Sequence, residues 1–357
     1  MQLTLSHFRL TGIAVSTGAE TKDYIKEGLA SGMSQSHLDR VSKTIGLKER
    51  KVATPGVTAL DLCEDASRRL LAAMDIDVST IDAIIFVTQT PDHSQPNNAC
   101  LLHGRLGLSK SSLAYDLSLG CSGWVYGLYQ AGLLCAHGGM GRVLLCAGDT
   151  LSRLTNPLDQ SMNPLFGDAG SATLIEKTGA NIPWYFLLGT DGKLASTIRV
   201  PAGGARTPSS NQTRIETKNS EGNNQHSENL IMDGAEVFNF SLREIPQAIN
   251  AVIKNATWQL KDVDALVLHQ ANKFIIENIA TKCGLKSACV PSTVVEKYGN
   301  PSSASIPAAM IDGLSAKLSN QSQKIVGCGF GVGLSWAAFA SDIGPVFTCP
   351  IQPYPLK

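Results

Sequence analysis

Leu-Ser-Leu-Gly-Cys-Ser-Gly-Trp-Val-Tyr-Gly-Leu, residues 117–128, combines two structural patterns in one short stretch. An apolar, strand-like run ends at Gly120, and an apolar helical pattern begins at Cys121 or just after it. This places Cys121 at a helix N-terminus, where peptide dipoles and unpaired N–H groups favour negative charge. We therefore expect the pKa of Cys121 to be lowered and its thiol to be a nucleophile. The alternative is a small core thiol like the other eight cysteines.

Other apolar runs have the composition of strands that are covered by helices on both faces. They are rich in branched residues and lie among helical patterns such as 60–74 and 237–260. These runs are residues 83–87, 143–147, 265–268 and 325–328. The alternation of strands and helices predicts an α/β fold.

Two pairs of segments resemble each other and indicate two halves built on one plan. Ile-Asp-Ala-Ile-Ile at 81–85 resembles Val-Asp-Ala-Leu-Val at 263–267, and Phe-Gly-Asp-Ala-Gly-Ser at 166–171 resembles Phe-Gly-Val-Gly-Leu-Ser at 330–335. We predict an N-terminal half, a connecting segment and a C-terminal half over residues 1–178, 179–229 and 230–357.

The polar stretch 203–228 lies within this connecting segment, and Ala205 and Ile215 are its apolar residues. Such a composition predicts a solvated surface loop or insertion. A recognition element is the alternative. The proline-rich end, residues 350–355, is incompatible with a helix or a central strand and predicts a surface tail.

The composition restricts the class of protein. With 43% hydrophobic and 17% charged residues, the chain is too apolar and too weakly charged for a disordered protein. Equal numbers of basic and acidic residues, 30 each, argue against a nucleic-acid partner. The uncharged stretch 117–141 is long enough to span a bilayer, but its glycines, Gln130 and His137 indicate a buried helix, so we expect no membrane association. Scattered cysteines and the absence of a signal-peptide pattern predict a cytoplasmic protein.

Two further segments hold polar residues at sites where chemistry is possible. His-Gln-Ala-Asn, residues 269–272, follows the predicted strand 265–268, at the end where ligand sites of α/β sheets open. Asn300 lies in the turn Gly-Asn-Pro-Ser, before a helix of small residues. Taken singly, a structural His and a plain Asn-Pro turn remain the alternative interpretations.

Together with Cys121, these segments resemble the thiolase-fold condensing enzymes, and most closely the β-ketoacyl-acyl carrier protein synthase III family. That family has a glycine-flanked Cys, a His-Gln-Ala-Asn segment and a Gly-Asn-x-Ser-x-Ala-Ser segment, here at 120–123, 269–272 and 299–305. Further matching segments are Gly-Leu-Lys-Glu-Arg at 46–50, Phe-Gly-Asp-Ala-Gly at 166–170 and Gly-Val-Gly-Leu-Ser-Trp at 331–336. The resemblance, which extends along nearly the whole chain, implies a thiolase-like fold with two pseudo-repeated halves in α-β-α-β-α layers.

The resemblance also implies roles for these residues. Cys121 would take the acyl group from a thioester, and the backbone N–H groups of Cys121 and Val332 would form the oxyanion hole. His269 and Asn300 would bind the carbonyl of a malonyl thioester, whose decarboxylative Claisen condensation gives a 3-oxoacyl product. Non-decarboxylating thiolases use a second Cys where this chain has Asn300. Acyl-CoA or acyl carrier protein would be substrates, and no metal or organic cofactor would be needed.

The sequence departs from the family pattern where coenzyme A is usually bound. The family's adenine-stacking Trp corresponds to Arg40, and its two coenzyme A arginines correspond to Thr44 and Gln160. Arg40 or Lys43 could still meet a phosphate. These replacements favour a donor carried by an acyl carrier protein.

The acyl pocket and the carrier-docking helix also differ. A Phe that lines the acyl pocket in one branch corresponds to Gln95, which suggests a more polar starter group. On the helix after His269, the docking position holds Phe274 beside Lys273, and Lys282 remains basic. Lys273, Lys282, Lys43 and Arg40 are therefore our candidates for carrier or coenzyme A binding.

The family resemblance further implies a C2 homodimer, for which the segments 143–147 and 98–104 offer apolar surface.

Three alternatives to condensation remain. The same fold could pass an acyl group from Cys121 to a hydroxyl or an amine, with His269 as general base. The chain could be a non-catalytic subunit of a hetero-oligomer, or a papain-like protease, although the sequence around Cys121 lacks the protease context.

Overall fold

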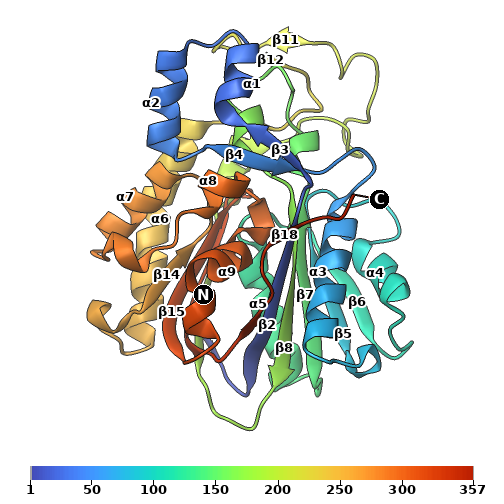
Figure 1. The fold of residues 1–357 in the computed structure, drawn as a ribbon, viewed down its shortest axis with the longest axis vertical. Helices are drawn as coiled ribbons and strands as arrows, with labels where there is room; N and C mark the ends of the chain where they lie inside the picture. The colour runs from blue at the N-terminus through green and yellow to red at the C-terminus, as the bar shows by residue number, and fades with distance from the viewer. Residues whose placement is uncertain (1, 357) are drawn as a thin grey trace.

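A computed structural model describes residues 2–356, whose strands form two main sheets (Figure 1). The first sheet has the order β17 (Phe347–Thr348), β2 (Phe8–Thr17), β8 (Ala169–Lys177), β7 (Arg142–Asp149), β5 (Ala83–Val87) and β6 (Leu113–Leu117), with β18 (Gln352–Pro353) also paired to β2. The second sheet has the order β1 (Gln2–Leu5), β9 (Trp184–Thr190), β16 (Ser335–Ile343), β15 (Gln323–Gly331) and β14 (Ala265–Leu268).

Short two-stranded ribbons lie outside these sheets. They pair β3 (Glu20–Asp23) with β4 (Glu49–Val52), β10 (Ile198–Arg199) with β13 (Ile231–Met232), and β11 (Thr217–Lys218) with β12 (Asn224–Gln225). The α-helices are α1 (Tyr24–Ala30), α2 (Gln35–Ile45), α3 (Ala59–Ala73), α4 (Asn98–Leu106), α5 (Gly123–Ala136), α6 (Gly234–Asn255), α7 (Lys273–Lys282), α8 (Val294–Tyr298) and α9 (Ser305–Leu318).

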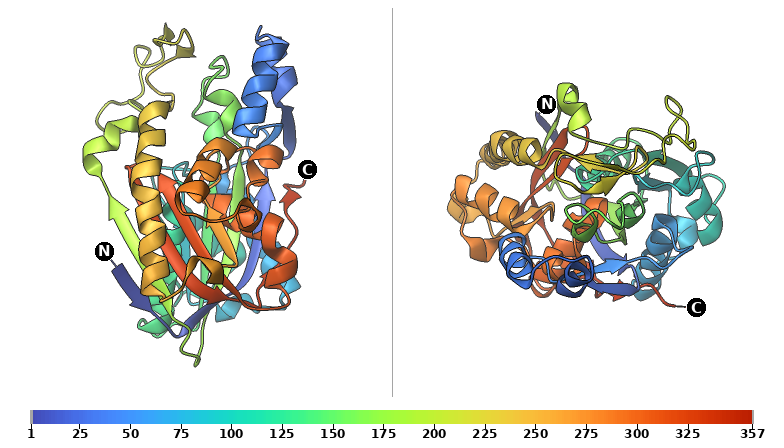
Figure 2. Two further views of the ribbon diagram at one scale, coloured as in Figure 1. Left: turned by 90° about the vertical axis from the view of Figure 1, so that its left-hand side faces the viewer. Right: turned by 90° about the horizontal axis from the view of Figure 1, so that it is seen from above.

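The helices and sheets form five layers (Figures 1 and 2). Helices α5 and α9 lie between the two sheets and contact strands of both. Helices α3 and α4 cover the outer face of the first sheet, and α6 covers the second sheet, with α7 packed against α6. This arrangement confirms the predicted α-β-α-β-α fold.

The two halves repeat the same topology. The order β2-β8-β7-β5 in the first sheet corresponds to β9-β16-β15-β14 in the second. In both series the first two pairings are antiparallel and the last is parallel. The weak internal similarity in the sequence therefore reflects a structural repeat.

The apolar pattern explains why α5 occupies the central layer. Its sequence is apolar around almost its whole circumference because sheets face it on both sides. Trp124 is fully buried there, and its Nε1 donates to Thr173 Oγ1 at 3.0 Å. The uncharged stretch is thus a buried helix, as predicted. Across residues 2–356, the structure contains no helix with the length and apolarity needed to cross a membrane.

The strands at each end of the chain belong to the sheet of the opposite half. Strand β1 from the N-terminus pairs with β9 at the edge of the second sheet, whereas β17 and β18 from the C-terminus pair with β2 in the first. The proline-rich tail therefore lies at a sheet edge on the surface, as its composition predicted.

The predicted dimer surface needs one correction. Residues 143–147 form the middle of β7, which is hydrogen-bonded to β8 on one side and β5 on the other. These residues are completely buried within the chain and cannot form an interface. An apolar run has the same sequence pattern whether it is buried within its own chain or by a partner subunit.

Candidate active site

Cys121, His269, Asn300 and Val332 line one cavity of about 120 Å³. Cys121 lies in the turn between β6 and α5, and His269 follows directly on β14. Asn300 follows α8, and Val332 follows β15. Residues from both halves, separated by up to more than half the chain in sequence, therefore meet at the same ends of the two sheets.

The turn at Cys121 is packed against β15. Helix α5 begins at Gly123, so Cys121 stands two residues before the helix rather than within its first turn. A Cβ on Gly331 would lie 3.1 Å from Cys121 Sγ, so only glycine at 331 lets β15 approach the thiol without displacing it.

This close packing reverses the predicted electrostatics of Cys121. Burial raises the pKa of its thiol to about 12, and the hydrogen bond with Ser302 opposes that shift. The prediction of a lowered pKa is therefore wrong, because the loss of hydration outweighs the effect of the nearby helix. At neutral pH the resting residue is a thiol.

His269 is buried and fixed by its surroundings. Its Nδ1 lies 2.7 Å from Ser305 Oγ, and its ring meets Phe330 edge-on at 5.4 Å. Burial lowers the pKa of His269 to about 3, because charging the ring would leave an ion without hydration. The imidazole is therefore neutral at physiological pH.

Asn300 is held by both its backbone and its side chain. Its N–H donates to Leu165 O at 2.9 Å, and its carbonyl accepts from Gly167 N. Its Oδ1 accepts from the N–H of Ser302 at 2.9 Å. This fixes the carbonyl side of the amide and leaves the NH₂ group as the donor that Asn300 can offer to a ligand.

Two backbone donors complete the set of polar groups. Cys121 and Val332 lie outside the helices and strands, and within residues 2–356 neither N–H donates to a backbone carbonyl. Both residues line the cavity. The Cys121 N–H is directed at its own sulfur, where it lowers the pKa of the thiol, and both N–H groups can donate to a ligand oxygen at this position.

The rest of the cavity wall is largely apolar. The apolar side chains are Leu151, Leu165, Phe166, Ile198, Leu230, Met232, Val237, Ile275 and Phe330. Such a wall excludes water, which strengthens each hydrogen bond to a developing charge and disfavours a free carboxylate.

The sequence did not point to a further group of polar residues behind Cys121. Gln89 lines the cavity and donates to Ser302 Oγ, which lies 3.6 Å from Cys121 Sγ. Asp149, buried at the end of β7, accepts from Gln89 N and from Ser303 Oγ. Gln89 follows the end of β5, much as His269 follows β14. This position after a buried strand is the sequence signal that could have indicated Gln89 as a site residue.

Other predicted site residues lie outside the cavity. Gln95 is exposed and does not line the Cys121 cavity of its own chain. Arg40 and Lys43 are exposed on α2. Lys273 packs against the end of that helix, because a Cβ on Gly46 would lie 2.7 Å from its Cβ. Helix α2, with Arg40 and Lys43, thus lies beside the start of α7, where Lys273 is 3.8 Å from Glu277; we call Arg40, Lys43 and Lys273 the basic patch.

Lys282 does not join this patch. It lies at the opposite end of α7 from Lys273, roughly 13 Å along the helix axis, and its Nζ donates to Leu242 O. The cavity is bordered by Ala271, Asn272 and Ile275, at the beginning of α7. Lys282 is therefore remote from the cavity.

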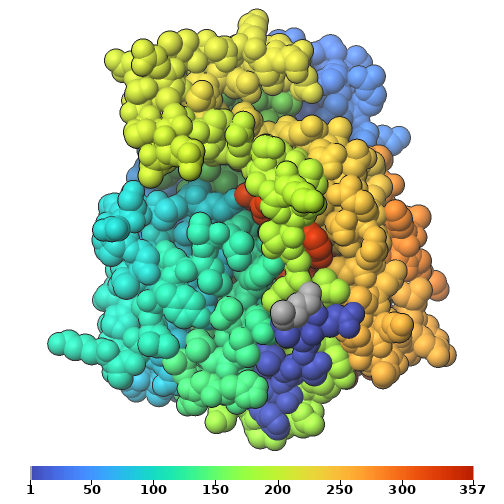
Figure 3. All heavy atoms as spheres, turned by 180° about the vertical axis from the view of Figure 1, so that it is seen from behind, coloured from blue at the N-terminus to red at the C-terminus, as the bar shows by residue number. Residues whose placement is uncertain are grey.

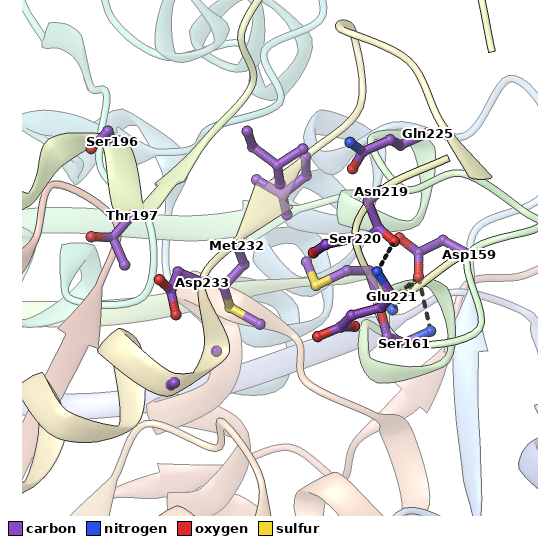
Figure 4. A pocket seen from close by; sticks show the side chains of 15 residues that line it. Asp159, Ser161, Ser196, Thr197, Asn219, Ser220, Glu221, Gln225, Met232 and Asp233 are labelled. Carbon is purple, nitrogen blue, oxygen red and sulfur yellow. Dashed lines mark hydrogen bonds between the residues drawn. The ribbon is translucent and has the colours of Figure 1, made fainter. Parts of the chain in front are cut away.

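A second, polar cavity of about 520 Å³ adjoins the first and shares Leu230, Met232 and Gly234 with it. Figure 4 shows the carboxylates of Asp159, Glu221 and Asp233 around it. Of the described residues that line it, none is Lys, Arg or His. One wall is the turn between β11 and β12, so the polar insertion is part of a cavity next to the active site.

The insertion is attached to the segment that holds Gln160. Asn223 Oδ1 accepts from Gln160 N, and Asn223 Nδ2 donates to Ser161 Oγ. The Gln160 side chain donates to Ser31 O at the end of α1. Figure 3 shows the insertion as a projecting part of the surface, which agrees with the predicted solvated loop.

Comparison with known proteins relates this site to one family. Residues 115–192 match the family 3-Oxoacyl-[acyl-carrier-protein (ACP)] synthase III, and residues 253–343 match its C-terminal domain. A beta-ketoacyl-[acyl-carrier-protein] synthase III of Caldanaerobacter subterraneus subsp. tengcongensis is 34% identical over 84% of this chain and 87% of its own length.

Solved structures give the same result. A 3-oxoacyl-(acyl-carrier protein) synthase of Burkholderia xenovorans LB400 superposes with a TM-score of 0.91, at 35% identity over 99% of both chains. The priming beta-ketosynthase of the R1128 polyketide biosynthetic pathway superposes with a TM-score of 0.82, at 25% identity over 95% of this chain and 97% of its own.

Proposed function

The chain belongs to the 3-oxoacyl-[acyl-carrier-protein] synthase III family, and we propose that it condenses an acyl thioester with a malonyl thioester. The observation that carries this proposal is the meeting of Cys121, His269 and Asn300 in one largely apolar cavity. A nucleophile, two side chains that can bind a carbonyl, and exclusion of water are what such a reaction requires.

In the first half-reaction Cys121 attacks the carbonyl carbon of an acyl thioester. The carbonyl oxygen becomes an oxyanion, which accepts hydrogen bonds from the N–H groups of Cys121 and Val332. The acyl group then passes to Cys121 Sγ, and the donor's sulfur leaves with the proton that the thiol gave up.

In the second half-reaction a malonyl thioester places its thioester carbonyl against His269 and Asn300. The apolar wall disfavours the malonyl carboxylate, so loss of neutral carbon dioxide relieves an unfavourable burial. The resulting enolate is stabilised by the two side chains, and its carbon attacks the acyl-Cys121 carbonyl. The 3-oxoacyl thioester forms, and Cys121 recovers its thiol on taking up a proton.

The test combines two measurements. The protein is incubated with acyl-CoAs and acyl carrier proteins, and intact-mass spectrometry detects the acyl adduct. Malonyl carrier protein labelled in its free carboxyl is then added, and released carbon dioxide is counted. Cys121→Ala should abolish the adduct, and Cys289→Ala, at a partly exposed thiol, should retain it. An acyl adduct that passes to a hydroxyl or amine without carbon dioxide release would overturn the proposal in favour of acyl transfer.

We also propose that the acyl donor is carried by an acyl carrier protein in preference to coenzyme A. Thr44 Oγ1 donates to Arg40 O, and the neutral Gln160 side chain donates to Ser31 O. The polar cavity next to Gln160 holds three carboxylates, which would repel the phosphates of coenzyme A. A carrier protein presents no nucleotide, and its acidic surface suits the basic patch of Arg40, Lys43 and Lys273.

The assembly we propose is a C2 homodimer. Among residues 2–356, strand β6 forms the edge of the first sheet and pairs with β5 alone, and Leu113 is 45% exposed. Pairing of β6 with its copy, supported by α4 beside it, would cover this edge. The exposed segment around Gln95 would then reach the partner's cavity and line its acyl pocket. Light scattering at micromolar concentration should give the mass of a dimer, and the mass of a monomer would refute this proposal.

A further inference from the structure

The hydroxyl of Ser302 is the side-chain group that contacts the sulfur of Cys121. Ser302 Oγ lies 3.6 Å from Cys121 Sγ, and both residues are buried. Ser302 begins the short 3-10 turn Ser302–Ala304, which leads directly into α9. The hydroxyl therefore belongs to a rigid junction and not to a surface loop.

The direction of this contact follows from Gln89. Its Nε2 donates to Ser302 Oγ at 3.1 Å, so the hydroxyl oxygen is already an acceptor. A hydroxyl carries a single proton, and its remaining acceptors here are the Cys121 sulfur and the Asp149 carboxylate, whose pKa burial raises and a hydrogen bond from Ser302 lowers. Gln89 thereby sets Ser302 as a donor toward Cys121 and Asp149.

The backbone holds Ser302 in an uncommon conformation. Its φ of 48° lies in the left-handed region, which costs free energy for a non-glycine residue. Two contacts hold the segment in place: Asn300 Oδ1 accepts from Ser302 N, and Asp149 accepts from Ser303 N and Oγ. The conformation is thus enforced by buried partners on both sides.

Gln89 is fixed equally well. Its N–H donates to the buried Asp149 carboxylate at 2.7 Å. A Cβ on Gly120 would lie 2.4 Å from Gln89 Nε2, so glycine at 120 is what leaves room for the amide. The residue before the nucleophile therefore has a function: it admits the group that orients Ser302.

We propose that Ser302 is a further catalytic residue, which donates a hydrogen bond to the Cys121 thiolate, and that Gln89 is the positioning residue that aims it. This proposal rests on the proposed role of Cys121 as nucleophile. Ser302 keeps its proton throughout, and the acyl group still passes from the donor sulfur to Cys121 Sγ. The hydrogen bond serves the sulfur when it carries charge, before the attack and again when the condensation product leaves.

The physical need for such a donor comes from burial. The same packing that brings Gly331 to the sulfur raises the pKa of Cys121, and the Ser302 hydrogen bond acts in the opposite direction. A hydrogen bond to a charged group changes an equilibrium roughly ten- to a hundredfold. Loss of Ser302 should lower the thiolate population by that factor.

The experiment measures the rate of Cys121 carbamidomethylation by iodoacetamide between pH 7 and pH 9, with site-specific mass spectrometry. Ser302→Ala should slow labelling at each pH roughly ten- to a hundredfold. Gln89→Met, which keeps the side-chain volume, should slow it in the same direction and by less. Ser241→Ala, which removes an equally buried serine hydroxyl on α6, should keep the wild-type rate.

A double variant tests the relay between the two residues. If Gln89 acts through Ser302, then Gln89→Met together with Ser302→Ala should be no slower than Ser302→Ala alone. Fully additive effects, or a wild-type rate in Ser302→Ala, would overturn the proposal. Slow labelling of the buried Cys63 and Cys328 in each protein reports that the chain is folded, and Gln89→Met carries the test if Ser302→Ala does not fold.

The outcome is separable from that of the proposed function. Acyl transfer to Cys121 in the wild-type protein is observed independently by intact mass. If Cys121 is acylated and Ser302→Ala labels normally, only the present inference fails. If the acyl group appears on another residue, the role of Cys121 itself is wrong.

Discussion

His269 Nδ1 lies 2.7 Å from Ser305 Oγ, the first residue of α9. The imidazole follows a strand of the second sheet, and the helix that fixes it lies between the two sheets. The orientation of the ring therefore depends on the packing of the central layer.

Ser305→Ala should reduce condensation while leaving the acylation of Cys121 unchanged. Without the hydroxyl, the His269 ring loses the partner of its inner nitrogen and samples unproductive orientations, and small misplacements cost up to about a hundredfold in rate. We expect kcat to fall roughly tenfold with little change in KM. Steady-state kinetics with malonyl carrier protein measures both, and an unchanged kcat would argue that Phe330, the Ser302 backbone and the strand hold the ring without Ser305.

His269→Ala and Asn300→Ala should separate the two half-reactions. Each variant should still form the acyl adduct on Cys121, because loading needs the thiolate and the backbone donors. Each should lose decarboxylation by about 10²–10³, the usual effect of removing one donor to a developing oxyanion. Release of labelled carbon dioxide is the measurement.

Asn278→Ala is the matched control for this pair. Asn278 lies on α7, and its Nδ2 donates to Phe274 O, away from the cavity. Its decarboxylation rate should equal that of the wild type. If Asn300→Ala also releases carbon dioxide at the wild-type rate, its assignment as a carbonyl-binding group is incorrect.

Acid should destabilise the protein partly through His269. The buried imidazole binds a proton near pH 3, whereas an unfolded His does so near pH 6.5, so the unfolded chain binds more protons in between. The free energy of unfolding therefore falls as pH is lowered through this window, by up to about 1.4 kcal/mol per pH unit from this one group. Urea denaturation of wild type and His269→Gln at pH 5 and pH 7 should show a shallower pH dependence for the variant. Equal slopes would mean that the pKa of the ring in the folded protein is close to its value in the unfolded chain.

Labelling of Cys121 should remain proportional to hydroxide concentration. With a pKa of about 12, the thiolate fraction rises about tenfold per pH unit throughout pH 6–9. Cys100 is exposed and Cys289 partly exposed, so Cys121 is not expected to be the one fast-reacting thiol, as the sequence alone had suggested. Mass spectrometry of tryptic peptides after timed iodoacetamide treatment gives each rate. A plateau for Cys121 near pH 7 would restore the original expectation of a lowered pKa.

Donor preference should depend on the basic patch. Acyl carrier protein should acylate Cys121 with a higher second-order rate constant than the matched acyl-CoA, and this advantage should shrink at high salt. Lys43→Glu and Lys273→Glu should slow the carrier reaction severalfold, and Lys282→Glu, at the far end of α7, should not. Equal or faster use of acyl-CoA by the wild type would contradict the proposed donor.

The sequence predicted the fold well because its signals are local. Strands β5 and β14 have the predicted bounds, since fully buried parallel strands are short apolar runs wherever they occur. The polarity of the insertion likewise predicted its exposure. Of the site residues that we predicted, those that line the cavity lie in the family motifs: Cys121, His269, Asn300 and Val332.

What the sequence did not predict depends on contacts between distant residues. Burial raises the pKa of Cys121, and part of that burial comes from β15, which follows it by some two hundred residues, so no local pattern reports it. Gln89 and Ser302 are 213 positions apart, and a glutamine or serine alone indicates no particular role. The interior position of 143–147 could not be distinguished from an interface, because both require apolar side chains.

The exchange of terminal strands has a consequence for synthesis on the ribosome. The first sheet has most of its strands by residue 177, yet its edge beside β2 stays uncovered until β17 and β18, at residues 347–353, have been made. Strand β1, made first, must wait for β9 before it has a partner. The nascent chain thus carries an open edge for most of its translation, when pairing with another chain is the main hazard. Completion of the last few residues closes it.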